Sequence, residues 1–422
     1  MKVFFRRIHL YLSFAAGLVI LICCLTGAIL VFEKDLMMVF NKDRYYVEAT
    51  GSRLSADSLV SSVKKAFPEA KVNGIKLYEE ADRSAEVSVA FGKKGGKDGD
   101  KVAGAKGANE KPAAGAIGEG AKAEASRGKE GAKGGAPQRQ PGFTIFVNPY
   151  TGQVLDKYTY SETGWYTVFA LHRWLLGGNN SIGKLIVGIS TLLFLFILIT
   201  GIILWWPKTV KIMKQRLNIK WGAGWKRINH DMHLVFGFYS AIFLFIFSFT
   251  GLAWSFEWFN KGIYTVTNSP MKAPEPPKST YIADAKRISF DKALAAAQTV
   301  YPSAEFYNIS APKDSTEPIS VSRLGADAAH ESATDAVYID QYSGAVLGKM
   351  AFGERSLGAQ VRSAFKPIHT GSIWGTPSKI IAFITCLLGV TFPITGTIMW
   401  YNRTRKKAKA AKKKVAEPDL VA

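Results

Sequence analysis

The sequence predicts a membrane α-helical fold, with four transmembrane helices in a duplicated two-helix arrangement and two extracytoplasmic α+β domains between them. Three observations lead to this fold class. Four windows of the 422-residue chain carry no charged residue, positive charges gather beside these windows, and residue patterns of the first half recur in the second half.

The four uncharged windows are long enough to cross a bilayer. At about 1.5 Å per residue, each forms a helix of about 33 to 37 Å, against a hydrocarbon core of about 30 Å. A soluble protein is therefore excluded. The first window is too long for a signal peptide and no A-x-A cleavage site follows it, so we interpret it as an uncleaved helix. The windows are Leu10–Phe32, Leu185–Trp206, Met232–Phe256 and Ile380–Tyr401.

Most of the formal net charge of +21 lies beside the apolar windows. Lysines and arginines cluster at 2–7, 208–227 and 403–414. The positive-inside rule places these three segments in the cytoplasm and the two long connections outside. We expect no nucleic-acid partner, because such a role needs basic residues and base-stacking aromatics on one folded face. The basic tail instead suits the anionic lipid of the membrane.

Corresponding residues in the two halves indicate a tandem duplication. His9 precedes Thr26-Gly27 by the same seventeen residues that separate His233 from Thr250-Gly251. Each half crosses the membrane twice, so the two repeats are expected to run parallel. Equal spacings also relate Lys184, Thr200-Gly201 and Trp205 to Lys379, Thr395-Gly396 and Trp400, and each outside connection has one Tyr-x-Gly-x-Val motif.

The outside connections are expected to form helices followed by strands. Apolar residues have helical spacing in Ser58–Ala66 and Phe290–Val300, and they alternate as in strands in Glu86–Phe91, Phe143–Val147, Ile319–Ser322 and Ala336–Ile339. The Gly/Ala/Lys-rich insertion at 92–141 has too little apolar surface to fold and is expected to be a disordered loop. The expected division is 1–33 transmembrane helix 1, 34–182 outside domain 1, 183–207 helix 2, 208–231 basic loop, 232–257 helix 3, 258–376 outside domain 2, 377–401 helix 4 and 402–422 basic tail.

Five of the six histidines lie beside the apolar windows. A neutral imidazole is a ligand of haem iron, and helix bundles build cofactor sites from side chains on facing helices. The duplication would place His9 opposite His233 on the cytoplasmic side and His172 opposite His369 on the outer side. We therefore expect two b-type haems, each with two histidine ligands. The alternative is that these histidines only satisfy helix ends at the membrane surface.

Other residues beside these histidines leave alternatives open. His230 is an alternative cytoplasmic ligand, although Arg6 occupies the matching place in the first half. Arg7 and Arg173, each close to an expected ligand, would pair with haem propionates or else contact lipid headgroups. The Thr-Gly pairs either allow close helix packing or leave room for a flat porphyrin, a role considered for Gly17, Gly27, Gly201 and Gly251.

These motifs resemble a known family. Arg-x-x-His before a Thr-Gly pair, Leu-His-Arg-Trp, Asp-x-His-Leu and Tyr-x-Gly-x-Val are similar to motifs of the PepSY-associated transmembrane proteins, which include iron-regulated membrane proteins and inner-membrane siderophore-iron reductases. The resemblance covers nearly the whole chain apart from the insertion and the tail. It implies PepSY-like outside domains in the periplasm, haem ligation by His9, His172, His233 and His369, and electron transfer to a ferric siderophore or another ferric chelate.

The expected function is therefore that of a haem-dependent ferric or siderophore reductase of the bacterial inner membrane, with both termini cytoplasmic. Some relatives carry a flavodoxin and reductase module, which this sequence lacks, so a cytoplasmic reductase or a quinone is expected to donate the electrons. A non-enzymatic regulatory protein, for example one that controls a peptidase, is an alternative that predicts no haem. An iron-chelate transport component would need polar residues in mid-membrane, and the windows offer almost none besides Thr and Ser.

Overall fold

A computed structural model describes residues 1–91 and 142–416, so the expected disordered insertion lies outside the described residues. The chain divides into two compact units. The bundle unit comprises Met1–Phe32, Val168–Asn260 and Ile368–Ala422, and the sheet unit comprises Glu33–Thr167 and Lys261–Pro367. The segments around His172 and His369, which the sequence assigns to the outside domains, therefore belong to the bundle unit.

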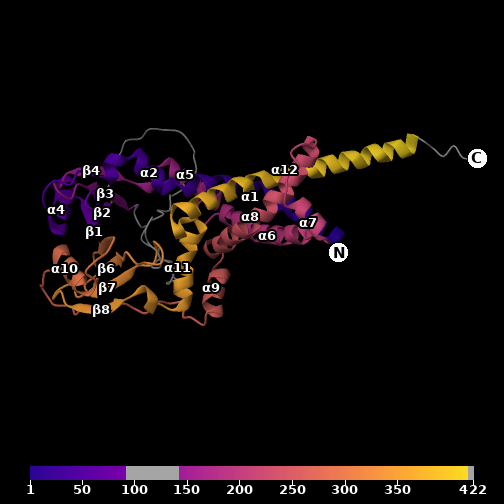
Figure 1. The fold of residues 1–422 in the computed structure, drawn as a ribbon. Helices are drawn as coiled ribbons and strands as arrows, with labels where there is room; N and C mark the ends of the chain where they lie inside the picture. Colours follow the sequence, from indigo (N-terminus) through magenta and orange to yellow (C-terminus); the bar gives the residue numbers. More distant parts are fainter. Residues whose placement is uncertain (92–141, 417–422) are drawn as a thin grey trace, which may run out of the picture. The chain divides into compact units, whose positions relative to one another are not determined.

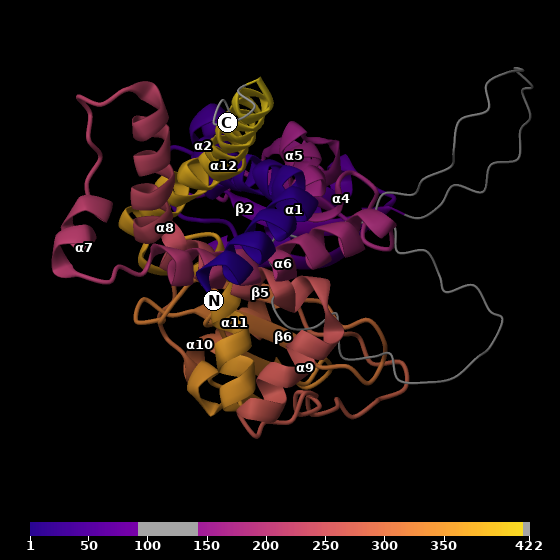
Figure 2. The same cartoon turned by 90° about the vertical axis from the view of Figure 1, so that its right-hand side faces the viewer.

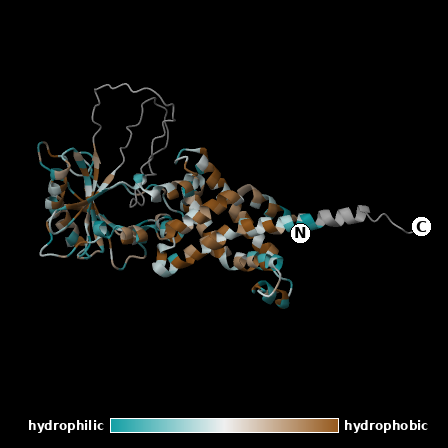
Figure 3. Cartoon of the chain, turned by 90° about the horizontal axis from the view of Figure 1, so that it is seen from above, coloured by the Kyte–Doolittle hydropathy of each residue, from teal (hydrophilic) through white to brown (hydrophobic). Residues whose placement is uncertain are grey.

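In the described residues, four helices are long and apolar enough to cross a membrane. They are α1 (Lys2–Val31), α6 (Ile182–Trp205), α8 (Trp225–Ser255) and α12 (Thr376–Ala416). In α12, the part that could cross a membrane is Thr376–Lys406. The four helices contain nearly all of the four windows, which confirms that each window is helical and long enough to span a membrane. Hydrophobic residues cover most of the bundle in Figure 3 and give way to hydrophilic ones near the N-terminus.

Helices α1 and α8 each pack against both α6 and α12, so the four helices form one bundle (Figures 1 and 2). Small side chains in its core, such as Ala16 and Cys24, allow the helices to approach closely. The larger residues Ile20, Phe194 and Leu244 fill the space between them. The three cysteines are free thiols.

The sheet unit contains one antiparallel sheet made from both halves of the chain. In the described residues the strand order is β4-β3-β2-β1-β5-β6-β7-β8 (Figure 1). The two expected outside domains therefore share one sheet and one hydrophobic core. The strands are β1 (Ala70–Tyr78), β2 (Ala85–Phe91), β3 (Phe143–Val147), β4 (Val154–Tyr158), β5 (Phe306–Ser310), β6 (Ile319–Leu324), β7 (Asp335–Ile339) and β8 (Val346–Met350).

The two half-sheets join where β1 pairs with β5, from Gly74 opposite Ser310 to Tyr78 opposite Phe306. A Cβ atom at Gly74 would overlap the carbonyl oxygen of Ile309, so only glycine lets the two backbones approach this closely. A β-bulge lies between Val72 and Gly74. It interrupts the alternation of apolar residues, and this explains why the sequence does not predict β1.

Helices α4 (Ala56–Ala66) and α10 (Phe290–Val300) contribute to the hydrophobic core of the sheet. Leu59 and Val63 of α4 and Ala293 of α10 are fully buried. The hydroxyl groups of Ser55 and Ser289 cap the two helices at equivalent positions. The remaining α-helices are α2 (Glu33–Phe40), α3 (Lys42–Tyr45), α5 (Gly164–Trp174), α7 (Val210–Arg216), α9 (Glu257–Val266) and α11 (Leu357–His369).

Asp57 and Asp291 cap each other's helices. The carboxylate of Asp57 accepts hydrogen bonds from the backbone N–H groups of Phe290 and Asp291, both at 3.0 Å, while that of Asp291 accepts from Ala56 and Asp57 at 2.7 and 3.1 Å. Each negative charge lies where the helix dipole of the other half favours it. Burial opposes ionisation of Asp57, but hydrogen bonds from Asp291 and Phe290 outweigh it and lower the pKa of Asp57.

The substitution Asp57→Asn is expected to destabilise the sheet unit at pH 7 by about 0.5 kcal/mol, because it removes the negative charge at the helix N-terminus and leaves a single acceptor oxygen. Because the pKa of Asp57 is lower in the folded state, its contribution is complete above the unfolded pKa of about 3.9 and is lost as the pH falls through the folded value. The difference in melting temperature between wild type and Asp57→Asn should therefore shrink below about pH 4. Circular dichroism of detergent-purified protein between pH 3 and 7 measures it, with exposed Asp82→Asn as the control. A difference that does not change with pH would contradict the capping role.

Candidate functional site

Each of the four repeated histidines contacts a Thr-Gly pair on a neighbouring helix. The contact joins the ring nitrogen Nδ1 to the threonine Oγ1. His9 of α1 meets Thr200 of α6 at 3.0 Å, His172 of α5 meets Thr26 of α1 at 2.9 Å, His233 of α8 meets Thr395 of α12 at 2.7 Å, and His369 of α11 meets Thr250 of α8 at 3.1 Å.

The threonine hydroxyl groups determine which ring nitrogen carries the proton. Each threonine donates its own hydroxyl hydrogen to the backbone carbonyl four residues earlier, at 2.7 to 2.9 Å, so its oxygen accepts from the ring. The Nδ1 atoms of His9 and His369 also lie 3.1 and 2.8 Å from the carbonyl oxygens of Ile197 and Phe247, which can only accept. We therefore assign the proton to Nδ1, which leaves the lone pair of Nε2 available to a metal.

The glycines of the pairs make room for the imidazole rings. An ideal Cβ atom at Gly27, Gly201, Gly251 or Gly396 would lie 3.2 to 3.4 Å from Cε1 of the contacting histidine. Gly17 instead faces Pro393. This geometry supports the alternative that the Thr-Gly pairs allow close packing, since the histidine rings occupy the space beside them.

The rings of His172 and His369 lie next to each other. Their centroids are 6.2 Å apart and their planes are inclined by 66°. Two imidazoles on opposite sides of one metal ion, each bound through Nε2 at about 2.0 Å, have centroids about 6.3 Å apart. The observed separation therefore suits one shared metal ion. The ring of Trp254 packs 5.4 Å from that of His369 and closes one side of the pair.

Burial keeps this histidine pair neutral. It lowers the pKa of His172 to about 4, together with repulsion from His369 and Arg173, and it also lowers the pKa of His369. Two uncharged rings can approach each other without repulsion, and a neutral imidazole is the form that binds a metal. At physiological pH the pair is therefore ready to act as ligands.

The turn that follows the helix of His172 has a strained backbone. Leu175 and Leu176 have φ angles of 50° and 68°, in the left-handed region that costs about 1 to 2 kcal/mol for a residue with a side chain. Hydrogen bonds from Leu176 N to the Ala170 carbonyl and from Gly177 N to the Trp174 carbonyl fix this turn. Strain of this kind is typical of functional sites. Sequence reasoning missed this turn.

The second pair, His9 and His233, lies at the other level of the bundle. The seventeen residues between His9 and Thr26 correspond to about 25 Å along α1. His9 and His233 are close enough for their charges to interact, and the ring of Phe392 packs against His233 at 5.6 Å. The bundle thus holds two histidine pairs, one near each end of α1.

Residues 6–403 match the family model described as the PepSY-associated TM region. The chain belongs to this family. No individually curated protein matches the sequence. The matched region of this PepSY-associated protein includes the four Thr-Gly pairs, one on each apolar helix, and the four histidines that contact them.

The other predicted site residues of this PepSY-associated protein lie apart from the Thr-Gly pairs. The guanidinium of Arg173 lies 5.5 Å from the Trp174 ring and interacts electrostatically with His172 and His369. Arg7 is exposed in the second turn of α1. His230 contacts Asp231, with Nδ1 at 3.2 Å from Oδ1, whereas His233 contacts a Thr-Gly pair. This geometry favours His233 over His230 as the ligand.

The donor set indicates what kind of metal the pairs suit. In the described part of the chain, no three His, Cys, Asp or Glu side chains come together as a metal site. Zinc held by protein usually takes three or four protein ligands. Two opposed histidines suit a metal that brings its other ligands with it, as haem iron brings the four nitrogens of its porphyrin. The residues present therefore fit haem.

The sheet unit carries a group of cations stacked on aromatic rings. Lys76 Nζ lies 4.5 Å from the ring centroid of Tyr78 and 4.0 Å from that of Phe306, and the guanidinium of Arg83 lies 4.3 Å from that of Tyr78. The hydroxyl of Tyr78 donates to Glu86 at 2.6 Å. Burial lowers the pKa of Lys76 and raises that of Tyr78. Because side chains alternate along β1, this cation–aromatic cluster (Lys76, Tyr78, Arg83, Phe306) lies on the face opposite the buried Ile75.

Proposed function

We propose that this PepSY-associated membrane protein is a haem-dependent reductase that passes electrons across the bacterial inner membrane to an external ferric siderophore or another ferric chelate. The observation that carries the proposal is the pair His172 and His369, neutral, 6.2 Å apart and each with Nε2 available, together with its counterpart His9 and His233. Haem b, when bound to these pairs, supplies one-electron chemistry at its iron.

The chain's own residues orient the ligands and adjust their basicity. A ligand histidine that donates its second N–H to an acceptor is fixed in orientation and becomes a stronger base. Thr26 and Thr250 do this for one pair, and Thr200 and Thr395 do it for the other. Arg173 lies near enough to the first pair to favour a negatively charged propionate there.

The orientation of the chain in the membrane follows from its charges. The basic segments beside the spans support a cytoplasmic location for both termini and a periplasmic location for the sheet unit. Equivalent contacts in the two halves, from the Thr-Gly pairs to the Asp57 and Asp291 caps, support an origin by duplication. In this orientation, helix α1 carries the proposed ligand His9 near its cytoplasmic end. Near its outer end, Thr26 of the same helix contacts the proposed ligand His172.

The sheet unit is suited to receive the chelate. Reduction releases iron because Fe(II) binds the hard oxygen ligands of a siderophore more weakly than Fe(III) does. The cation–aromatic cluster offers positive charge for the anionic oxygens of such a chelate and flat rings for its aromatic groups. The proposed electron donor is a separate partner, either a cytoplasmic reductase or a membrane quinone.

An absorption spectrum tests the proposed function. Protein purified in detergent from haem-replete cells is expected to show a low-spin b-type spectrum, reduced minus oxidised, with about two haems per chain, because each of two histidine pairs supplies both axial ligands. Pyridine haemochrome assay gives the haem content. Reduced protein in liposomes should be reoxidised by ferric siderophores. A colourless preparation would overturn the proposal and favour the regulatory or the transport alternative.

A further inference from the structure

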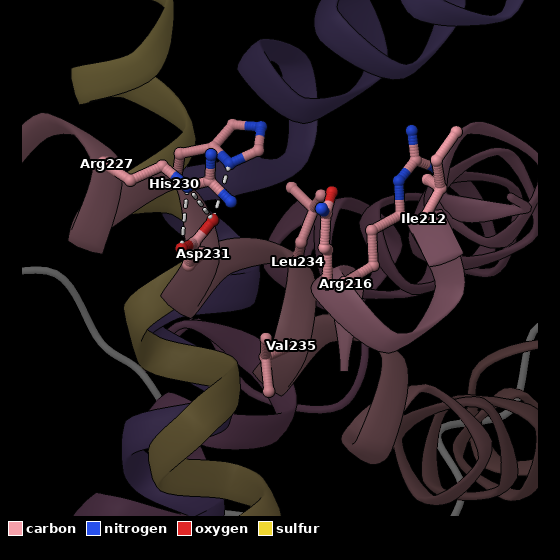
Figure 4. Close-up of a pocket in the computed structure, with 8 residues that line it drawn as sticks. Ile212, Arg216, Arg227, His230, Asp231, Leu234 and Val235 are labelled. Carbon is pink, nitrogen blue, oxygen red and sulfur yellow. Dashed lines mark hydrogen bonds and ion pairs between the residues drawn. The ribbon is translucent and has the colours of Figure 1, made fainter. Parts of the chain in front are cut away.

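A cleft of about 210 Å³ lies between α7 and the start of α8 in the bundle unit (Figure 4). It combines polar groups with an apolar wall. Leu234 and Val235 of α8 and Ile212 of α7 supply the apolar side chains, while the polar side chains are Gln215, Arg216, Arg227, His230 and Asp231. The cleft can therefore bind a ring that has polar substituents.

The carboxylate of Asp231 orients His230 in this cleft. Asp231 is only 3% exposed and accepts hydrogen bonds from Arg227 Nε at 2.7 and 2.8 Å and from the Lys220 backbone N–H at 3.3 Å. His230 Nδ1 lies 3.2 Å from Asp231 Oδ1, and Figure 4 shows the contacts of Asp231 with Arg227 and His230 as dashed lines. Because the carboxylate can only accept, it holds the ring proton on Nδ1. The Nε2 atom of His230 is then free to accept a proton.

The position of His230 links the cleft to the second histidine pair. His230 and His233 are three residues apart on α8, so their side chains lie on one face of the helix. Arg216 donates to the carbonyl groups of Leu204 and Trp205, which places the cleft at the last turn of the apolar helix α6. A ligand in the cleft is thus within reach of the bilayer and beside a predicted haem ligand.

We propose that this cleft binds the ring of a lipid-soluble quinol and that His230 accepts a proton during its oxidation. The inference rests on the proposed function and names its electron donor. An O–H bond of the quinol breaks and its proton goes to Nε2 of His230, while the first electron would go to the ferric haem that His9 and His233 would hold. Loss of the second proton to water and of a second electron to another ferric haem gives the quinone, so two irons are reduced for each quinol.

An anionic phosphate, such as a lipid headgroup, is the main competitor for the cleft. Its binding would draw on the guanidinium groups, yet Nη1 of Arg216 already binds two carbonyl groups and Nε of Arg227 already binds Asp231. The buried carboxylate of Asp231 also repels an anion. A neutral quinol meets neither obstacle, and its hydroxyl group matches the acceptor on His230.

The first experiment measures binding without requiring electron transfer. The fluorescent quinol analogue heptyl-hydroxyquinoline N-oxide is titrated into the purified protein in phosphatidylcholine nanodiscs, and quenching reports binding. We expect saturable binding at one site per chain. Ile212→Trp, which fills the cleft from the α7 side, should weaken it about tenfold or more by steric exclusion, whereas His230→Gln should retain it. Absence of saturable binding, equal binding by Ile212→Trp, or loss of binding when phosphatidylglycerol replaces half of the lipid would overturn the proposal.

The second experiment tests the proton acceptor. Menadiol is mixed with oxidised holoprotein in a stopped-flow spectrometer, and haem reduction is followed. His230→Gln should slow reduction about a hundredfold, the usual contribution of a general base, while reduction by dithionite and the haem spectrum stay unchanged. His330→Gln, a histidine of the sheet unit, is the matched control and should behave as wild type. Reduction of His230→Gln at the wild-type rate would refute the role of His230. A protein without haem would overturn the reductase and this role together, while the analogue titration still decides whether the cleft binds a quinol ring.

Discussion

Replacing His369 with Ala is expected to remove one of two haems and to abolish electron delivery to ferric chelates. His369 and His172 are the two rings that stand 6.2 Å apart, so loss of either leaves the iron with one protein ligand. The haem content should fall from about two to about one per chain, and any haem that remains bound there should become high-spin. Pyridine haemochrome assay and reoxidation of reduced protein by ferric siderophores measure the two effects.

His172→Ala should remove the same haem as His369→Ala. The His172→Ala/His369→Ala double variant should therefore lose no more haem per chain than either single variant does. Variants of His9 or His233 should lose the other haem. His330→Ala is the control, because His330 packs on Phe352 in the sheet unit. If the His172→Ala/His369→Ala double variant still reduced ferric chelates at the wild-type rate, electrons would leave the protein by another route and the siderophore-reductase proposal would be wrong.

The second large effect concerns Thr26, which accepts the hydrogen bond of His172. Thr26→Val keeps the shape of the side chain but removes the hydroxyl acceptor, so the ring of His172 keeps only the backbone of Cys23 as a partner and its proton is held less firmly on Nδ1. We expect haem affinity at this pair to fall about 10- to 100-fold, as when other hydrogen-bond partners of metal ligands are removed. Haem transfer to apomyoglobin, followed by absorption, measures the loss.

Thr191 supplies a matched control for this substitution. It lies in α6, and its hydroxyl group donates to the carbonyl of Val187, as the hydroxyl of Thr26 donates to that of Ile22. Thr191→Val should therefore reproduce the general effect of losing a buried hydroxyl group without changing haem affinity. Thr26→Ser should restore most of the affinity because it restores the acceptor. Equal haem retention in Thr26→Val and Thr191→Val would show that the contact with His172 is unimportant.

The sequence predicts the membrane helices well because an apolar stretch of this length without charges is rarely anything but a transmembrane helix. It also predicts β3 and β7, where apolar residues alternate and turn residues follow. It does not predict β1 and β5, the strands that join the half-sheets. The bulge between Val72 and Gly74 disrupts the pattern of β1, and β5 is a five-residue strand with Asn308 at its centre. The single shared sheet depends on these two strands, so the sequence indicated two separate domains.

For the candidate site, the repeat identifies the four histidines and the Thr-Gly pairs but does not show that they contact each other. The two partners of each contact lie on different helices, as His9 on α1 and Thr200 on α6 do. Spacing along one helix cannot reveal which helices are neighbours. A signal was nevertheless present, because the seventeen-residue separation of His9 from Thr26 recurs between His233 and Thr250. Such conservation of spacing within the chain fits contacts at two fixed levels of the bundle.

The pairing of β1 with β5 also determines the order in which the protein can fold during its synthesis. Tyr78 pairs with Phe306, which the ribosome reaches only after α6 and α8 have been made. At about 5 to 20 residues per second, this takes about 10 to 45 s. Throughout that interval β1 is an open edge that could pair with another chain, and its bulge and Lys71 are features that discourage such pairing. The sheet therefore completes only after the third membrane helix has been translated.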